Sequence, residues 1–134
     1  MHGRFQAEWQ SGCEETIGET RALGVIPGRV SRLVARRLPQ IGWNSVEAEA
    51  DPLFAAAPLG EAYYANSYVC RPADRNAVIA WSEHDGDRFA AAVRAGNTVG
   101  VQFHPEKSSA AGVRLVREFL KQARQSAGRA GRER

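Results

Sequence analysis

The feature that most constrains the fold is a series of short apolar segments separated by turn residues. Residues 77–81 (AVIAW) form a continuous apolar run, which is typical of a strand covered on both faces. Asp85-Gly86 is a turn dipeptide between this run and residues 89–93 (FAAAV). A second turn at Gly96-Asn97 leads into residues 98–104 (TVGVQFH). The pattern predicts three consecutive strands in a hairpin-like meander.

The segments before this meander carry weaker strand patterns. Residues 29–34 alternate polar and apolar side chains, which predicts a strand with one buried face, and residues 45–49 are a second short candidate. Residues 62–69 (AYYANSYV) are rich in aromatic side chains and predict one continuous strand. Between these segments, Asp51 is a candidate cap for a brief helical turn, with Pro52 at its first position.

One amphipathic helix follows the strands. Its apolar residues recur at three- and four-residue steps: Val113, Val116, Phe119 and Leu120. Ser108 and Ser109 are candidate N-caps, and we expect the helix to end near Gln125. The chain then divides into a domain over residues 1–125 and a flexible basic tail over residues 126–134.

Composition limits the class of protein. The chain has 134 residues, 43% of them hydrophobic and 25% charged, which is typical of one soluble domain or part of a larger one. A net charge of +3 is too small to indicate nucleic acid, and no apolar stretch reaches the ~20 residues of a membrane span. Two cysteines, Cys13 and Cys70, exclude a disulfide scaffold and favour the cytoplasm. Strands followed by a single helix lack covering layers for both sheet faces, so we expect half of an α/β fold with a mixed sheet.

The residues that carry chemistry follow the last predicted strand. His104 ends that strand and Glu106 lies two residues beyond, so in extended geometry both side chains emerge on the same side. A carboxylate beside an imidazole fixes its tautomer and stabilises the imidazolium, as in the base and orienter of a nucleophilic triad. A bare pair of this kind is also compatible with a purely structural role. No spacing supports a zinc site that would add His84.

The longer string resembles a known family. Residues 100–107 (GVQFHPEK) are similar to the signature that closes the active site of class I, or triad, glutamine amidotransferases. Residues 39–44 (PQIGWN) resemble the Pro-His-Met-Gly-Trp-Asn segment of one branch, the glutaminase subunits of imidazole glycerol phosphate synthase in histidine biosynthesis. Residues 23–30, 52–54 and 63–68 follow in the same order, and the resemblance covers about residues 14–120.

The resemblance implies an activity and a partner. Family members hydrolyse glutamine with a Cys-His-Glu triad and pass ammonia to a (βα)8-barrel cyclase subunit, and they need no cofactor or metal. His104 is implied as the general base and Glu106 as its orienter. The implied fold is an incomplete flavodoxin-like, three-layer α/β fold. The residues implied at the cyclase interface are Trp43, Asn44, Tyr63 and Lys107.

This chain departs from the family pattern at the nucleophile. It has no Gly-x-Cys-x-Gly-x-Gln string, and His2 aligns with the position of the nucleophilic cysteine. Cys13 is a poor substitute because Glu14 and Glu15 would raise the pKa of its thiol. Gln40 and Asn66 also replace family histidines, which favours a divergent relative with a different synthase partner.

We therefore expect the C-terminal part of a glutaminase subunit, inactive alone because it lacks the nucleophile. A fragment or mis-started reading frame, half of a split or decayed gene product, and a short paralogue would each explain this pattern. The alternative function is a non-catalytic module that binds a synthase partner.

Overall fold

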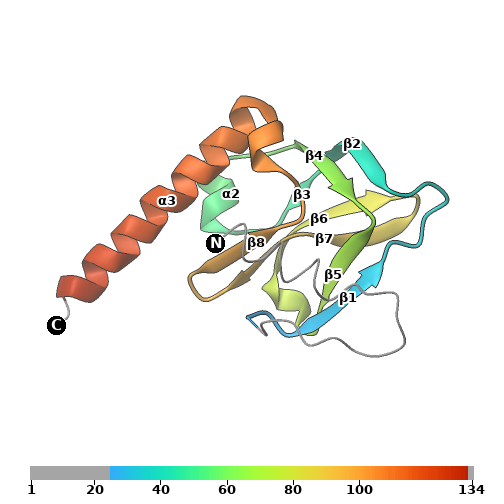
Figure 1. Ribbon diagram of the computed structural model, residues 1–134. Helices are drawn as coiled ribbons and strands as arrows, with labels where there is room; N and C mark the ends of the chain where they lie inside the picture. Colours follow the sequence, from blue (N-terminus) through green and yellow to red (C-terminus); the bar gives the residue numbers. More distant parts are fainter. Residues whose placement is uncertain (1–24, 133–134) are drawn as a thin grey trace.

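The computed structural model describes residues 25–132, which form three small antiparallel sheets beside a long C-terminal helix (Figure 1). The strands are β1 (Gly28–Arg32), β2 (Gln40–Ser45), β3 (Glu47–Ala48), β4 (Glu61–Asn66), β5 (Tyr68–Pro72), β6 (Val78–His84), β7 (Asp87–Ala95) and β8 (Thr98–Val101). The helices are α2 (Pro52–Ala56) and α3 (Ser109–Arg132), with 3-10 turns η1 (Arg75–Ala77) and η2 (Pro105–Lys107). Sheets combined with a C-terminal helix confirm the expected α/β class.

The predicted meander forms the largest sheet. Its strand order is β3-β6-β7-β8, and β1 pairs with β5 and β2 with β4. Every pairing within the described residues is antiparallel, so this part of the chain does not contain the parallel pairs that a mixed sheet requires. The turn between β6 and β7 places Asp85 at φ 49° and Gly86 at φ 83°. Both values lie in the left-handed region that Asp tolerates and Gly adopts freely, which is why this dipeptide makes a tight hairpin.

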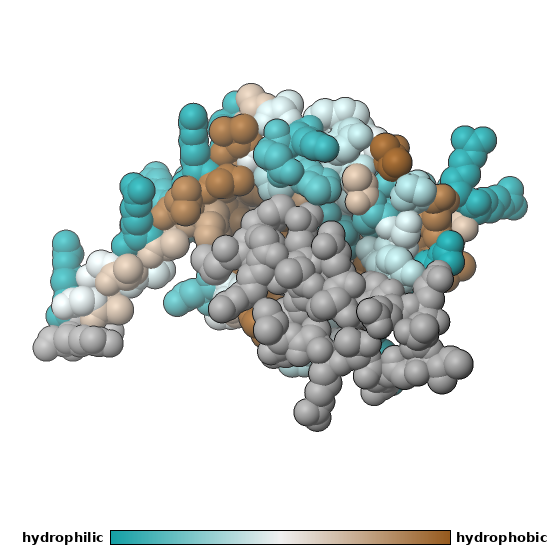
Figure 2. Space-filling view, in the orientation of Figure 1, coloured by the Kyte–Doolittle hydropathy of each residue, from teal (hydrophilic) through white to brown (hydrophobic). Residues whose placement is uncertain are grey.

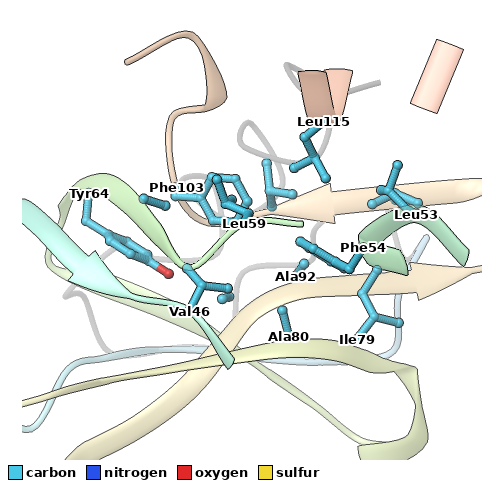
Figure 3. Close-up of a cluster of buried hydrophobic side chains, with 14 of the residues drawn as sticks. Val46, Leu53, Phe54, Leu59, Tyr64, Ile79, Ala80, Ala92, Phe103 and Leu115 are labelled. Carbon is cyan, nitrogen blue, oxygen red and sulfur yellow. The ribbon is translucent and has the colours of Figure 1, made fainter. Parts of the chain in front are cut away.

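Strand β7 is buried on both faces and divides the core in two. Phe89 and Ala91 belong to a larger cluster that includes side chains of α2, α3 and β8, whereas Ala90 and Val93 belong to a smaller cluster with Cys70. Figure 3 shows the larger cluster, where Leu53 of α2 and Leu115 of α3 approach one core. A strand covered on both faces carries a nearly continuous apolar sequence.

A buried tyrosine joins the larger cluster to a polar chain. Tyr64 is fully buried, and its ring packs edge-to-face on Phe89 and Phe103. Its hydroxyl lies 2.6 Å from Ser82 Oγ, and Ser82 donates in turn to the Ser45 carbonyl at 2.7 Å. Burial raises the pKa of Tyr64 above its ordinary value, so the phenol stays neutral.

Asp51 begins α2 as predicted and also binds a distant strand. Its side chain accepts a hydrogen bond from Leu53 N, and Pro52 occupies the first turn. Arg94 of β7 donates to both carboxylate oxygens, Nε at 2.8 Å and Nη2 at 2.9 Å. Burial alone would raise the pKa of Asp51, but these hydrogen bonds and the charge of Arg94 outweigh it and lower the pKa.

The prediction of one strand over residues 62–69 was wrong. The chain breaks at Ser67 into β4, which pairs with β2, and β5, which pairs with β1. Leu33 N donates to the Ser67 carbonyl, and the Asn66 side chain donates to the Tyr68 carbonyl. These hydrogen bonds stabilise the change of direction at Ser67. The alternation of polar and apolar side chains in the sequence does not predict them.

Two predicted element ends also differ from the structure. The last strand stops at Val101, and His104 instead forms an isolated bridge with Tyr63. Helix α3 continues past the expected end near Gln125 to Arg132, where Ala and Arg residues favour helix despite two glycines. The flexibility of the segment that begins at residue 126 stays a prediction. No helix among residues 25–132 is long and apolar enough to cross a membrane.

The Asp51–Arg94 pair predicts a pH-dependent stability. Asp51→Asn keeps an amide cap but removes the charge, and we expect it to lower the free energy of unfolding at pH 7 by about 1.5–3 kcal/mol. A lowered folded-state pKa means that the stabilisation is complete above the unfolded value of about 3.9 and is lost as the pH falls through the folded value.

Urea denaturation of both proteins between pH 7 and pH 2.5 measures this difference. The difference between wild type and Asp51→Asn should shrink as the pH falls, while the exposed control Glu49→Gln should stay close to wild type throughout. A difference that is constant with pH would contradict the ion pair as its cause.

Candidate active site

His104 and Glu106 are in contact. Nδ1 of His104 lies 2.9 Å from Oε1 of Glu106, with the two side chains 22% and 58% exposed. His104 is extended, at φ −98° and ψ 100°, and the chain then folds into η2 at Pro105. The predicted approach of the two groups is therefore present, but a 3-10 turn produces it rather than a continued strand.

The contact defines what the pair can do chemically. A carboxylate that accepts from Nδ1–H keeps the proton on that nitrogen and leaves Nε2 as an acceptor. The same carboxylate stabilises the imidazolium that forms when Nε2 takes a proton. The pair therefore has the geometry of a base and its orienter.

The other sequence candidates for chemistry do not join this pair. Cys70 is buried in the smaller core cluster with Ile26 and Val78. His84 Nε2 lies 3.0 Å from the Arg37 carbonyl, at the β6–β7 turn. His2 and Cys13 lie outside the described residues. Over residues 25–132 no group of three or more His, Cys, Asp or Glu side chains could hold a metal ion.

Ser108 holds the backbone of this turn, a role that sequence reasoning missed. We expected a helix cap, but its hydroxyl accepts from Tyr63 N at 3.0 Å and donates to the His104 carbonyl at 2.6 Å. Tyr63 also accepts from His104 N at 2.9 Å. The bridge between β4 and His104 brings the Tyr63 amide and the His104 carbonyl within reach of the Ser108 hydroxyl. The local sequence around Ser108 does not reveal this pairing.

The start of α3 packs directly on the turn through a glycine. A Cβ added at Gly112 would lie 2.1 Å from the Pro105 carbonyl oxygen and 2.8 Å from Ser108 Cβ. Only the absence of a side chain allows this approach. The position of η2, and of Glu106 within it, therefore depends on Gly112.

Three of the four predicted interface residues gather beside His104. Trp43 and Tyr63 are paired across β2 and β4, with ring centroids 6.2 Å apart in an edge-to-face arrangement. Lys107 Nζ lies 5.7 Å from the centroid of the Tyr63 ring, within the range of a cation–π interaction. Trp43 is 53% exposed. We call Trp43, Tyr63 and Lys107 the aromatic face.

Asn44, the fourth predicted interface residue, is engaged inside the molecule. Its Nδ2 donates to Gln40 Oε1 and to the Glu83 carbonyl, both at 2.8 Å, and its Oδ1 accepts from Ser45 N. Gln40 donates in turn to Asn66 Oδ1 at 3.0 Å. The two residues that replace family histidines thus contact one another across β2 and β4.

An apolar groove borders the same site. It has a volume of about 390 Å³ and runs between β8 and α3, with Glu106 on its lining. Figure 2 shows apolar side chains along α3, where Val113, Val116 and Leu120 are 41–49% exposed. At the end of β8, Gln102 Oε1 is buried without a hydrogen-bond partner in the described part of the chain.

This fold and signature define the class of protein. The family model for glutamine amidotransferase class-I matches residues 16–123. The chain belongs to the class I glutamine amidotransferase family, whose α/β fold the sheets and C-terminal helix represent in part.

Several relatives within the family carry the name "Imidazole glycerol phosphate synthase subunit HisH". The Corynebacterium diphtheriae protein is 40% identical over 125 residues, which are 87% of this chain and 59% of that protein. The Halobacterium salinarum protein is 41% identical over 79% of this chain and 50% of its own length. The Chlorobaculum tepidum protein is 38% identical over 78% of this chain and 54% of its own length. The chain thus spans between half and three-fifths of the length of these relatives.

The packing at Gly112 predicts that the turn tolerates no side chain there. We expect Gly112→Ala to lower the free energy of unfolding by about 3 kcal/mol or more, because the new methyl overlaps a backbone carbonyl. Thermal denaturation measures this effect.

The same helix offers a matched control. A Cβ added at Gly128 meets nothing within 4 Å, so Gly128→Ala should stabilise by up to about 1 kcal/mol. Equal effects of the two substitutions would contradict the close packing at Gly112.

Proposed function

We propose that this chain contributes the base and orienter of a glutaminase site and serves imidazole glycerol phosphate synthase in histidine biosynthesis. The observation that carries the proposal is the 2.9 Å contact between His104 and Glu106, in a chain about 40% identical to subunits of that synthase. The reaction is hydrolysis of glutamine to glutamate and ammonia, and the compartment is the cytoplasm.

In the proposed reaction, His104 Nε2 takes the proton of a cysteine thiol, and the thiolate attacks the glutamine carboxamide. The imidazolium then donates that proton to the leaving ammonia, and water hydrolyses the thioester. Glu106 holds the imidazole and stabilises its charge. The thiol belongs to the family motif Gly-x-Cys-x-Gly-x-Gln, which this 134-residue sequence does not contain. We therefore expect the 134-residue polypeptide to release no ammonia from glutamine when assayed alone.

The exposed apolar surface supports a site in which this chain supplies the base and another polypeptide segment supplies the thiol. The groove between β8 and α3 reaches Glu106, and most of its lining side chains are apolar. A polypeptide that covers the groove would therefore lie beside Glu106, the orienter of the base.

The aromatic face favours a second candidate function, that of a module which binds a synthase partner without catalysis. Tryptophan and tyrosine are enriched among the residues that dominate binding energy at protein interfaces. Trp43 is exposed and Tyr63 carries a lysine over its ring. The proposed partner is the (βα)8-barrel cyclase subunit, as it is for the catalytic proposal.

A chimaera tests the catalytic proposal. Residues 25–132 replace only the residues of the C. diphtheriae relative that align with them, and the chimaera keeps all the rest of that protein. We expect glutamine hydrolysis in the presence of the cyclase, and His104→Asn should lower kcat/KM by roughly 10³-fold or more because the thiol loses its base. Glutamate release measures the rate.

His84 provides the control for this experiment. His84→Asn should leave the chimaera close to its full rate, because that ring lies at the β6–β7 turn and contacts Arg37. A folded, cyclase-bound chimaera with equal rates for wild type and His104→Asn would refute the catalytic role.

A second prediction concerns binding. We expect Trp43→Ala to weaken affinity for the cyclase by about 30-fold or more, since truncation of a central tryptophan removes about 2 kcal/mol. Val34→Ala is the control, because Val34 is 77% exposed and lies outside the aromatic face. Titration calorimetry with the cyclase measures both. Equal affinities of the two variants would exclude the aromatic face as the binding surface.

A further inference from the structure

Ser108 connects two surfaces that the proposed function assigns to different tasks. Its hydroxyl joins the Tyr63 amide to the His104 carbonyl, and His104 N donates back to the Tyr63 carbonyl. Both backbone groups of Tyr63 and both of His104 are therefore engaged in one closed ring of hydrogen bonds. Tyr63 belongs to the aromatic face, and His104 carries the imidazole.

We propose that Ser108 is a positioning residue, which transmits the position of the aromatic face to the His104 imidazole and its contact with Glu106. The inference rests on the proposed function for the meaning of those two surfaces, but the connection itself is a property of the fold. A partner that moves β4 at Tyr63 then moves the backbone on which the imidazole is mounted.

The chemistry of the position calls for a hydroxyl. Ser108 is fully buried, and its oxygen both accepts from an N–H and donates to a C=O. Alanine would leave Tyr63 N without this acceptor. Of the ring, only the hydrogen bond from His104 N to the Tyr63 carbonyl would remain, and the turn could rotate about it. Threonine would add a methyl group where Gly112 already packs against Ser108 Cβ.

The turn η2 provides a second connection between the aromatic face and the His104 imidazole. Glu106 and Lys107 both belong to η2, so the residue that orients His104 and the residue over the Tyr63 ring share one turn. Lys107 N donates to the His104 carbonyl at 3.1 Å, the same oxygen that accepts from Ser108. A shift of that carbonyl therefore reaches the aromatic face and the Glu106 contact together.

Nuclear magnetic resonance of the His104 imidazole in the full chain tests the proposal. The sequence has three histidines, so single substitutions of His2 and His84 by Gln assign the signals. We expect the Nδ1–H proton of His104 to exchange with water roughly tenfold faster in Ser108→Ala than in wild type. Ser109→Ala, at the adjacent exposed serine, should leave this rate unchanged. Ser108→Cys keeps a side chain of similar size with a weaker donor, so its rate should be intermediate.

A double substitution tests whether a change in the aromatic face reaches the His104 imidazole through Ser108. Trp43→Ala should shift the His104 imidazole signals in the wild-type background and leave them unshifted in the Ser108→Ala background. Equal shifts in both backgrounds, or exchange in Ser108→Ala and Ser108→Cys that matches Ser109→Ala, would overturn the proposal. Should Ser108→Ala fail to fold, Ser108→Cys carries both comparisons. The readout needs no glutamine, so an inactive chimaera with this result intact would refute the proposed glutaminase role alone.

Discussion

The rest of the structure depends on strand β7, which is buried on both faces. Its five residues from Phe89 to Val93 are at most 2% exposed and contribute to both core clusters. Three consecutive alanines let the two layers approach closely, since small side chains leave room for larger neighbours. The strand is fixed at both ends by charge, because Arg94 binds Asp51 at the start of α2 and Asp87 binds Arg71 of β5. Burial would raise the pKa of Asp87, but the hydrogen bonds from Arg71 and Val34 N and the charge of Arg71 outweigh it and lower that pKa.

The site follows from this strand by two short steps. The turn at Gly96, with φ 58°, reverses the chain and pairs β8 with β7, which places Gln102 and His104 at the end of the sheet. There the strand ends and Tyr63 replaces β7 as the hydrogen-bond partner, so His104 emerges where two sheets meet. An imidazole mounted at such a junction has a buried backbone and a partly exposed ring. This combination suits a base that must keep its orientation and still reach a substrate.

Local sequence patterns predicted the turns and the helix cap, whose conformations depend on nearby residues. They did not predict features that depend on contacts between residues distant in the sequence. Asp85-Gly86, Gly96-Asn97 and the Asp51 cap were predictable because their conformations are intrinsic to those residues. The break at Ser67 depends on Leu33, which is remote in sequence. The His104–Glu106 contact was predicted from spacing, although the geometry comes from a 3-10 turn, and the resemblance to the family added the assignment of roles. The partners of Ser108 could not be predicted, because no pattern reveals which amide a hydroxyl will reach.

The polar network behind the aromatic face changes how Asn44 is understood. The Asn44 side chain connects β2 to β6 through the Glu83 carbonyl, and the Tyr63 carbonyl connects β4 to His104. The β2–β4 sheet is therefore held in place through both of its strands. Because both ends of the Asn44 amide are occupied, a direct hydrogen bond to a partner would require it to give up an internal one. If the proposed partner binds at the aromatic face, Asn44 would support Trp43, the preceding residue of β2, by fixing the strand to β6 rather than by touching the partner. A face mounted in this way keeps its shape before a partner arrives, which reduces the entropy lost on binding.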